Sequence, residues 1–271
     1  MKVLDLYRQT KKALESLGIE EADAEARLIV ADGLNIGLGD IFLQGGRETN
    51  FDPAEILAKR AVGMPLGYAM RKKYFMGFPF YVDQNVLIPR LDTEIIVDEA
   101  LRLIQGYGYK TALDLCCGSG CIGIVMERLA GLRVLGSDIS LEAVRIANQN
   151  AEALGTVRYR AIQSDLFEGI KETFELIVCN PPYITEGEYG NLDAQVRDWE
   201  PKGALVGGLA FYENIAPRAR GFLRAGGALA FEIGCGQKSA VETILKKNYY
   251  KNIRCIKDLA GRDRVIVCTI S

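Results

Sequence analysis

The chain has 271 residues, a formal net charge of −2, seven cysteines and no histidine. The missing histidine excludes a Ser-His-Asp triad, a Cys-His pair and a Cys₂His₂ zinc site. An enzyme of this composition has to use carboxylates, Lys, Cys, Tyr or chemistry that needs no strong base. The near-neutral charge argues against a protein whose affinity depends on neutralising phosphates, so we do not expect a nucleic-acid partner.

The cysteines and the start of the sequence indicate the compartment. The cysteines are odd in number and include no C-x-x-C pair, which argues against a disulfide framework, a zinc ribbon or another metal site. The sequence starts without the apolar region of a signal peptide, and no apolar run approaches the roughly 20 residues of a membrane helix. We therefore expect a cytoplasmic protein that acts as a monomer and has no membrane partner.

Residues 1–73 have the pattern of a small helical domain. Apolar residues recur at helical spacing from Leu4 to Leu17. Further helices are expected over residues 23–34, 40–43 and 53–62. The second helix would be closed by Gly33, and the last would have Asp52 as its N-cap and Pro53 at its first helical position. These segments predict a bundle of four or five helices.

The pattern changes after residue 73. Residues 74–90 contain an aromatic stretch with Gly77 and Pro79 inside it, which predicts a β-hairpin linker. A helix is expected from Pro89 to about Gln105. Beyond it, strands are expected over residues 111–117, 133–139, 157–163, 174–180, 228–233, 253–257 and 264–270, and helices over 121–129, 141–154, 212–223 and 237–248. Residues 91–271 are therefore predicted to form an α/β domain, with a mostly parallel sheet covered on both faces and one antiparallel edge strand.

A glycine-bearing turn follows the first strand of this domain, in the pattern Asp114-x-Cys116-x-Gly118-x-Gly120. Such turns lie at the carboxyl edge of an open α/β sheet, where ligands bind. Asp138 ends the next strand, where a carboxylate suits the ribose hydroxyls of a nucleoside. The pattern is more like a methyltransferase's S-adenosylmethionine loop than the G-x-G-x-x-G of a nicotinamide site. The structural alternatives are a merely tight turn and a surface carboxylate.

A second motif, Asn180-Pro181-Pro182-Tyr183, follows a strand at the same edge. An amide or aromatic amine nitrogen is a poor nucleophile, because its lone pair is delocalised. The Asn180 side-chain oxygen and a backbone carbonyl of the Pro-Pro segment would accept both N–H groups and orient this nitrogen toward a sulfonium methyl group. Tyr183 would stack on the planar group, and the prolines stiffen the loop. Adenine, cytosine and glutamine all satisfy this geometry, and the structural alternative is a proline-rich strand end with a packed tyrosine.

Several further residues have both a functional and a structural interpretation. Thr93 and Glu94 either belong to the binding site or stabilise the start of a helix, where a negative charge interacts favourably with the positive end of the helix dipole. Glu232 ends an apolar strand at the same edge, so a site role and a structural role both remain open. The structural interpretation is preferred for Arg262 and Arg264 in a solvated turn, Cys179 as a buried thiol and the aromatic stretch 74–82 as a packed linker.

Ordered motifs run through nearly the whole chain. They are Gly63-Met64-Pro65-Leu66, Val86-Leu87-Ile88-Pro89-Arg90, Thr93-Glu94, Asp114 to Gly123, Ser137-Asp138-Ile139-Ser140, Ser164-Asp165-Leu166-Phe167, Asn180-Pro181-Pro182-Tyr183-Ile184, Glu200-Pro201, Phe231-Glu232-Ile233-Gly234 and Asp258 to Val265. Together they resemble the HemK/PrmC family of protein-glutamine methyltransferases, which modify peptide chain release factors.

The resemblance implies a seven-stranded, Rossmann-like methyltransferase domain, preceded by a helical domain that helps to grip the release factor. It implies S-adenosylmethionine as cofactor and the glutamine of a Gly-Gly-Gln loop as the target. The implied catalytic residues are Asn180, Pro181 and Tyr183. The implied cofactor-binding residues are Asp114, Cys116, Gly118, Gly120, Asp138, Ile139, Asp165, Leu166 and Asn180. The implied substrate-binding residues are Arg90, Glu94, Asn180, Pro181, Pro182 and Tyr183.

Three positions depart from the family pattern. Cys116 stands where the family has the first loop glycine. A small side chain is tolerated at this position if φ is negative. Leu91 replaces the proline after Arg90, and the loop after Gly208 is about three residues shorter. None of these positions lies in the Asn-Pro-Pro-Tyr tetrad.

Two other functions remain open from the sequence. A nucleic-acid adenine amino methyltransferase would use the same tetrad, and the near-neutral charge counts against it. A non-catalytic binding module would keep the cofactor fold alone, and the intact tetrad from Asn180 to Tyr183 argues against it.

Overall fold

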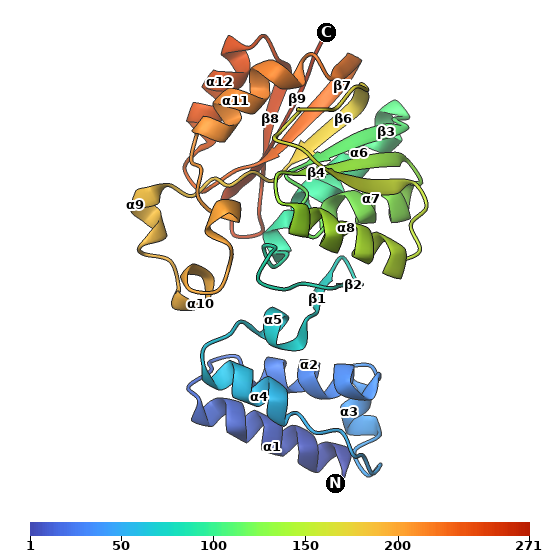
Figure 1. Cartoon of the computed structure of the whole chain (residues 1–271), viewed down its shortest axis with the longest axis vertical. Helices are drawn as coiled ribbons and strands as arrows, with labels where there is room; N and C mark the ends of the chain where they lie inside the picture. The colour runs from blue at the N-terminus through green and yellow to red at the C-terminus, as the bar shows by residue number, and fades with distance from the viewer. The chain divides into compact units, whose positions relative to one another are not determined.

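The computed structural model describes residues 1–271, which divide into two compact units (Figure 1). One unit comprises Met1–Lys72 and Ala194–Trp199, and the other comprises Lys73–Asp193 and Glu200–Ser271. The assignment of residues 1–73, 74–90 and 91–271 to three separate functional parts stays a prediction. No helix combines the length and the apolar character needed to cross a membrane.

The first unit consists of short helices around an apolar core. Its elements are α1 (Val3–Ser16), α2 (Ala22–Leu34), α3 (Asp40–Leu43), α4 (Ala54–Ala61), α5 (Leu66–Met70) and α10 (Ala194–Arg197). At helical spacing, α1 buries Val3, Leu6 and Leu14, and α2 buries Ala26, Ile29 and Val30. Because apolar stripes of this kind need a partner, α1 and α2 pack against each other and confirm the predicted helical region.

A buried ion pair connects the helices of this unit. Arg60 on α4 is 4% exposed and donates to both carboxylate oxygens of Glu25 on α2, at 2.9 and 2.8 Å. Its Nη1 donates to the Met64 carbonyl and, at 3.1 Å, to Oε1 of Gln195 on α10. Arg60 therefore links α2, α4 and α10 through one guanidinium group.

Two details predicted for these helices are wrong. Gly33 does not close α2; the helix continues to Leu34 and is ended by Asn35, whose φ is 53°. Gly33 lies inside the helix because the Phe51 ring packs against it, and a Cβ atom there would lie 2.2 Å from that ring. Likewise, Pro53 is the N-cap of α4 rather than its first helical residue, and the Asp52 carboxylate accepts a hydrogen bond from the Ala54 N–H at 3.0 Å.

The second unit starts with the predicted hairpin. β1 (Lys73–Phe75) and β2 (Phe78–Phe80) pair antiparallel, and the turn residues Met76 and Gly77 both have positive φ, as a two-residue hairpin turn requires. Phe75 and Phe80 bury their rings in the same core as α6 (Glu94–Tyr107). A short 3₁₀ turn, η1 (Leu91–Thr93), precedes α6, so the helix starts later than Pro89.

A seven-stranded sheet forms the centre of this unit, in the order β5-β4-β3-β6-β7-β9-β8. Its strands are β3 (Thr111–Leu115), β4 (Arg133–Asp138), β5 (Tyr159–Gln163), β6 (Phe174–Cys179), β7 (Leu223–Glu232), β8 (Lys251–Lys257) and β9 (Asp263–Thr269). The strands β3 to β7 are parallel, which confirms the predicted α/β class. The antiparallel strand is not at the edge as predicted: β9 lies between β7 and β8. A short turn forces β8 and β9 to pair antiparallel, and β8 then runs with the parallel strands.

Helices cover both faces of the sheet (Figure 1). Alternate strand residues such as Ala112 and Val134 face α6, α7 (Cys121–Ala130) and α8 (Leu141–Ala153) in one core. Their neighbours Leu113 and Leu135 face α11 (Ala210–Ala219) and α12 (Lys238–Lys247) in the other. The remaining elements are α9 (Glu186–Tyr189) and η2 (Lys202–Ala204), which the sequence pattern did not predict. Because the strands are buried on both faces, their carboxyl ends and the loops that follow are where polar chemistry is concentrated.

Candidate functional site

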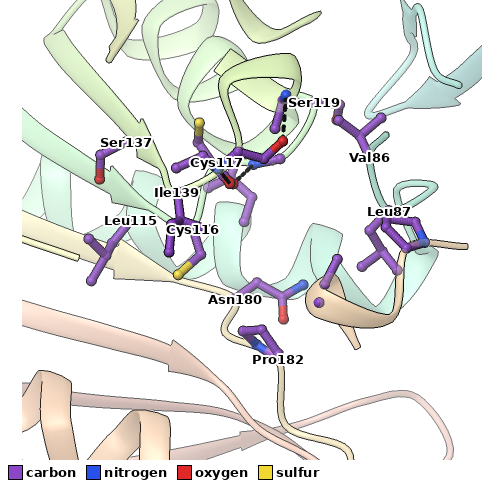
Figure 2. Close-up of a pocket in the computed structure, with 18 of the residues that line it drawn as sticks. Val86, Leu87, Leu115, Cys116, Cys117, Ser119, Ser137, Ile139, Asn180 and Pro182 are labelled. Atoms are coloured by element: carbon purple, nitrogen blue, oxygen red, sulfur yellow. Dashed lines mark hydrogen bonds between the residues drawn. The ribbon is translucent and has the colours of Figure 1, made fainter. Parts of the chain in front are cut away.

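A cavity of about 250 Å³ lies at the carboxyl edge of the sheet, lined by the loops after β3, β4, β5 and β6. The segment before α6 and the segment around η2 complete its wall. The strands β3 and β6 are neighbours, with Leu115 paired to Cys179, so the glycine turn and the Asn-Pro-Pro-Tyr tetrad lie side by side. Figure 2 shows Asn180 below the loop after β3, with Cys116 on one side of it and Leu87 on the other.

The loop after β3 takes a left-handed backbone conformation at three positions. The φ angles of Cys116, Gly118 and Gly120 are 60°, 52° and 81°. The condition under which a small side chain would be tolerated at Cys116, a negative φ, is therefore not met, and this residue holds a conformation that favours glycine. At Gly120 a Cβ atom would lie 2.9 Å from the Tyr159 hydroxyl, so the loop also needs a glycine there for space.

Asp138 fixes this loop to the end of β4. Its Oδ2 accepts the Gly118 N–H and its Oδ1 accepts the Ser140 N–H, both at 2.9 Å. Burial raises the pKa of Asp138, and the hydrogen bonds from Ser140 and Gly118 oppose that shift. Asp138 lines the cavity together with Ile139, which is 67% exposed, so a carboxylate and an apolar side chain are presented at one strand end.

Asp114 supports the loop from beneath and does not line the cavity. It is completely buried, and its Oδ2 accepts the Gly123 N–H at 2.9 Å, in the first turn of α7. Its Oδ1 has no hydrogen-bond partner. Burial raises the pKa of Asp114 to about 8, and the Gly123 hydrogen bond opposes this shift. The structure therefore gives Asp114 a place in building the loop rather than in the wall of the cavity.

Asn180 lines the cavity directly after β6, and its amide is held at one end. Its Nδ2 donates to Oγ1 of Thr93 at 3.3 Å, and its Oδ1 accepts no hydrogen bond from the protein. Pro182 lines the cavity next to it, while Pro181 is buried behind the wall. The side-chain carbonyl oxygen of Asn180 is therefore the end of the amide that is available to a ligand.

Tyr183 points away from the cavity, toward a buried carboxylate. Its hydroxyl donates to Oε1 of Glu232 at 3.4 Å, and its backbone carbonyl accepts from Nε2 of Gln237 at 2.8 Å. Burial is the main cause that raises the pKa of Tyr183, and the nearby charge of Glu232 adds to it. Tyr183 thus does not lie in the wall where the sequence placed a stacking ring.

Arg90 lines the cavity, whereas Glu94 does not. The Arg90 guanidinium donates to Oε1 of Glu200 at 2.5 Å, and Oε2 of Glu200 accepts the Ile88 N–H at 3.3 Å. Glu200 therefore ties the segment before α6 to the segment of η2 on the facing wall. Glu94 instead accepts the Met76 N–H at 2.8 Å and holds the β1–β2 hairpin against α6.

The structure brings most of the predicted site residues to one cavity. Those in its wall are Arg90, Cys116, Gly118, Asp138, Ile139, Asp165, Leu166, Asn180 and Pro182. Those outside it are Glu94, Asp114, Gly120, Pro181 and Tyr183. Wall residues that were not predicted as site residues include Asn85, Ser119, Ser164, Gly203 and Phe211. Ser119 and Ser164 lie inside motifs that were recognised, whereas no sequence signal marks Gly203 or Phe211.

Comparison with known proteins finds related sequences over most of the chain. Residues 94–195 match the family model described as "Methyltransferase small domain". The chain is 41% identical to the release factor glutamine methyltransferase of Clostridium acetobutylicum, over 75% of this chain and 74% of that protein. It is 32% identical to the release factor glutamine methyltransferase of Chlorobaculum tepidum, over 98% of this chain and 96% of that protein.

A solved structure supports the fold alone. The Thermus thermophilus 16S rRNA N2 G1207 methyltransferase, in complex with AdoMet and guanosine, superposes with a TM-score of 0.55 at 17% identity. The match covers 74% of this chain and 50% of that chain.

Proposed function

The chain belongs to the family of release factor glutamine methyltransferases. From this premise we propose that it transfers a methyl group from S-adenosylmethionine to a glutamine of peptide chain release factors. The methyl group would be attached to the side-chain amide nitrogen (N5) of the glutamine in the Gly-Gly-Gln loop. The observation that carries this proposal is the position of Asn180. Asn180 lines the cavity beside the glycine loop after β3, and its side-chain oxygen accepts no hydrogen bond from the protein. A single cavity therefore combines an acceptor for an amide N–H with the residues that a nucleoside cofactor requires.

The residues of the cavity fit S-adenosylmethionine. Each oxygen of Asp138 accepts one backbone N–H and keeps further acceptor capacity, which suits the two ribose hydroxyls. Ile139 and Leu166 offer apolar surface to the adenine ring, and the exposed carboxylate of Asp165 offers an acceptor for its amino group. The loop from Cys116 to Gly120 would hold the methionine part. When bound, S-adenosylmethionine supplies a sulfonium methyl group that a nucleophile can take.

Asn180 orients the nitrogen that accepts the methyl group. Its Oδ1 accepts one N–H of the substrate amide, and a backbone carbonyl of the Pro181-Pro182 segment accepts the other. Both N–H bonds are then fixed in the plane of these acceptors, so the nitrogen lone pair is directed toward the methyl group. Positioning of this kind can lower the barrier by roughly 7–11 kcal/mol.

This reaction needs no strong base. The nitrogen becomes acidic once it is alkylated, and its proton then leaves to water. A chain with no histidine can therefore run the reaction through positioning. The two prolines contribute by stiffening the loop that carries the acceptors.

The proposal includes a cytoplasmic monomer that recognises a protein loop rather than a nucleic acid. All seven cysteines are free thiols, which suits a reducing compartment. The formal charge of −2 offers no excess of positive charge for binding phosphates.

The proposed substrate is tested by a labelled-methyl transfer assay. The enzyme is incubated with labelled S-adenosylmethionine and, in separate reactions, a release factor, the same factor with its loop glutamine replaced by alanine, duplex DNA and RNA. We expect label on the intact release factor alone. Label on DNA or RNA but not on the release factor would establish a nucleic-acid amino methyltransferase instead.

A further inference from the structure

Arg90 is the one cationic side chain in the wall of the cavity, which otherwise carries the carboxylates of Asp138 and Asp165. The Arg90 side chain is 37% exposed, so it lies where the cavity meets solvent. A guanidinium carries several N–H donors. The Nη2 group of Arg90 donates to Glu200, whereas its Nε and Nη1 groups donate to no protein acceptor. Arg90 therefore keeps N–H donors for a ligand at the mouth of the cavity.

Glu200 is a buried carboxylate that pairs with Arg90 from behind this wall. Its side chain is 1% exposed, and it does not line the cavity. Its Oε1 accepts from Arg90 at 2.5 Å, and its Oε2 accepts the Ile88 N–H at 3.3 Å. Burial raises the pKa of Glu200, and the charge of Arg90 and these two hydrogen bonds oppose that shift because they stabilise the charged form. Glu200 thus balances the charge of Arg90 with a fixed negative charge outside the cavity.

An arginine without this partner would favour phosphate at the mouth of the cavity. The guanidinium fork matches phosphate oxygens, and hydrogen bonds between two charged groups are strong. A nucleic-acid base that enters a catalytic cavity brings the phosphates on both sides of its ribose to the mouth, because they are covalently joined to it. A glutamine in a loop with glycines brings uncharged main-chain carbonyl groups instead. The charge at the mouth therefore distinguishes these two classes of substrate.

The balanced pair of Arg90 and Glu200 favours the uncharged class. A phosphate beside Arg90 would be attracted by the guanidinium and repelled by the carboxylate of Glu200. A main-chain carbonyl carries no net charge and needs only the N–H donors that Nε and Nη1 of Arg90 provide. The carboxylates of Asp138 and Asp165 add negative charge to the wall, which suits the positive sulfonium of S-adenosylmethionine and repels phosphate. Repulsion of the wrong partner is a general source of specificity.

We infer that Glu200 is a specificity-determining residue, which holds Arg90 and neutralises its charge so that the cavity admits an uncharged peptide loop and disfavours nucleic acid. This inference rests on the proposed function for the identity of the favoured substrate. The rejection of nucleic acid depends on the pair of Arg90 and Glu200 alone, and it is tested without methyl transfer. Glu200 acts through Arg90 and does not touch the reacting atoms.

A first test measures the binding of RNA and needs no methyl transfer. The probe is a fluorescein-labelled single-stranded RNA, and its anisotropy is followed with the full-length enzyme saturated with S-adenosylhomocysteine. We expect Glu200→Gln to lower the Kd of the RNA about tenfold relative to the wild type, because it leaves a charged guanidinium free for phosphate. The gain should shrink as the salt concentration rises. A merely structural defect at Glu200 would leave RNA binding unchanged or weaken it.

Two further variants separate the pair from general effects of charge and folding. Glu127→Gln removes the same charge from another buried carboxylate, which accepts two backbone N–H groups at 3.3 and 3.2 Å, pairs with no arginine side chain and does not line the cavity. We expect its Kd for RNA to stay within about twofold of the wild type, because salt screens a distant charge. The double variant Arg90→Gln/Glu200→Gln keeps the net charge of the wild type and should also match its Kd for RNA.

Three results would overturn the inference. The first is an equal Kd for RNA in E200Q and the wild type, and the second is the same gain in E127Q. The third is much weaker binding of RNA by the double variant, because Arg90 would then attract phosphate in the wild type despite Glu200. The double variant decides the question even if E200Q alone does not fold, since two glutamine amides can pair where the ion pair was.

A second test uses turnover of a release factor with the same RNA as competitor. We expect the RNA to inhibit E200Q at about tenfold lower concentrations than the wild type or E127Q. Glu200→Asp keeps the charge and should recover most of the resistance to RNA. Equal inhibition of E200Q and the wild type would contradict the role of Glu200. A wild-type enzyme that methylates no release factor would instead refute the proposed function, and the binding of RNA would still decide the role of Glu200.

Discussion

The Gly118 N–H donates to Oδ2 of Asp138 at 2.9 Å and so joins the glycine loop after β3 to the end of β4. The same carboxylate accepts the Ser140 N–H through its other oxygen. One side chain thus holds the loop in place and presents its remaining acceptor capacity to the cavity. In the proposed cofactor site, the shape of the loop and the contact with the ribose would therefore depend on the same group.

Replacement of Asp138 should weaken cofactor binding strongly. We expect Asp138→Ala to raise the Kd of S-adenosylmethionine at least tenfold, because hydrogen bonds to a charged group contribute about 1.5–3 kcal/mol each. Isothermal titration calorimetry measures this directly. Glu142→Ala, in the first turn of α8 and exposed, is the control and should leave Kd unchanged. An equal Kd for D138A and the wild type would remove Asp138 from the site.

Cys116 should be better replaced by glycine than by alanine. Its φ of 60° disfavours any residue with a Cβ atom, so the comparison between two small residues isolates the backbone. We expect Cys116→Gly to be more stable than Cys116→Ala by about 1 kcal/mol. Denaturant unfolding of both variants measures the difference, and a more stable C116A would show that the loop is not held in the left-handed region.

Asp114 should make the fold less stable as the pH rises toward 8. Burial raises its pKa from 3.8 to about 8, so between these values the folded state retains a proton that the unfolded chain has lost. The free energy of unfolding then falls with increasing pH. Burial also raises the pKa of Glu232, to about 7, so this group likewise lowers the free energy of unfolding as the pH rises. Most of its effect is complete by pH 7, so the decline between pH 7 and 8 reports mainly on Asp114.

We therefore expect Asp114→Asn to flatten the decline in stability between pH 7 and 8. Denaturant unfolding at closely spaced pH values measures the slope for both proteins. Glu232→Gln provides the comparison and should flatten the decline below pH 7 instead. Equal slopes for D114N and the wild type from pH 7 to 8 would show that the Asp114 carboxyl is not the group that titrates there.

Two neighbouring residues of α4 should differ sharply in their effect on stability. Arg60 is buried and paired with both oxygens of Glu25, so Arg60→Ala leaves a carboxylate without its partner and should destabilise the helical unit by about 3–5 kcal/mol. Lys59 pairs with Glu55 at the surface, where solvent screens the interaction, and Lys59→Ala should have little effect. Thermal unfolding followed by circular dichroism compares the two. A loss in K59A as large as that in R60A would contradict the importance of burial.

The strand order explains why much of the site could be predicted from the sequence. Apolar strands such as Thr111–Leu115 and Phe174–Cys179 are buried on both faces, and parallel strands place their carboxyl ends at one edge. The residues that follow them, among them Cys116 and Asn180, had to meet there. Local patterns also identified a hairpin within residues 74–90, although not its turn at Met76-Gly77, and the apolar stripe of α1.

Contacts between distant parts of the chain could not be predicted in this way. Glu200 reaches Arg90 across 110 residues, and Arg60 reaches Gln195 across 135, and no periodicity marks either pair. The position of β9 between β7 and β8 depends on pairing between strands, which the periodicity of a single strand does not specify. Tyr183 was expected to stack on the substrate, and its hydrogen bond to Glu232 is set by a strand that lies 49 residues later.

The central claim is that the methyl group is transferred to a glutamine held by Asn180. The most direct measurement is tandem mass spectrometry of a release factor incubated with S-adenosylmethionine and either wild-type enzyme or Asn180→Ala. We expect one added methyl group on the glutamine of the Gly-Gly-Gln loop with the wild type. With N180A we expect a rate lower by about 100-fold or more, with binding of S-adenosylmethionine still measurable. A methyl group on another residue, no methyl group at all, or an N180A enzyme as fast as the wild type would contradict the account.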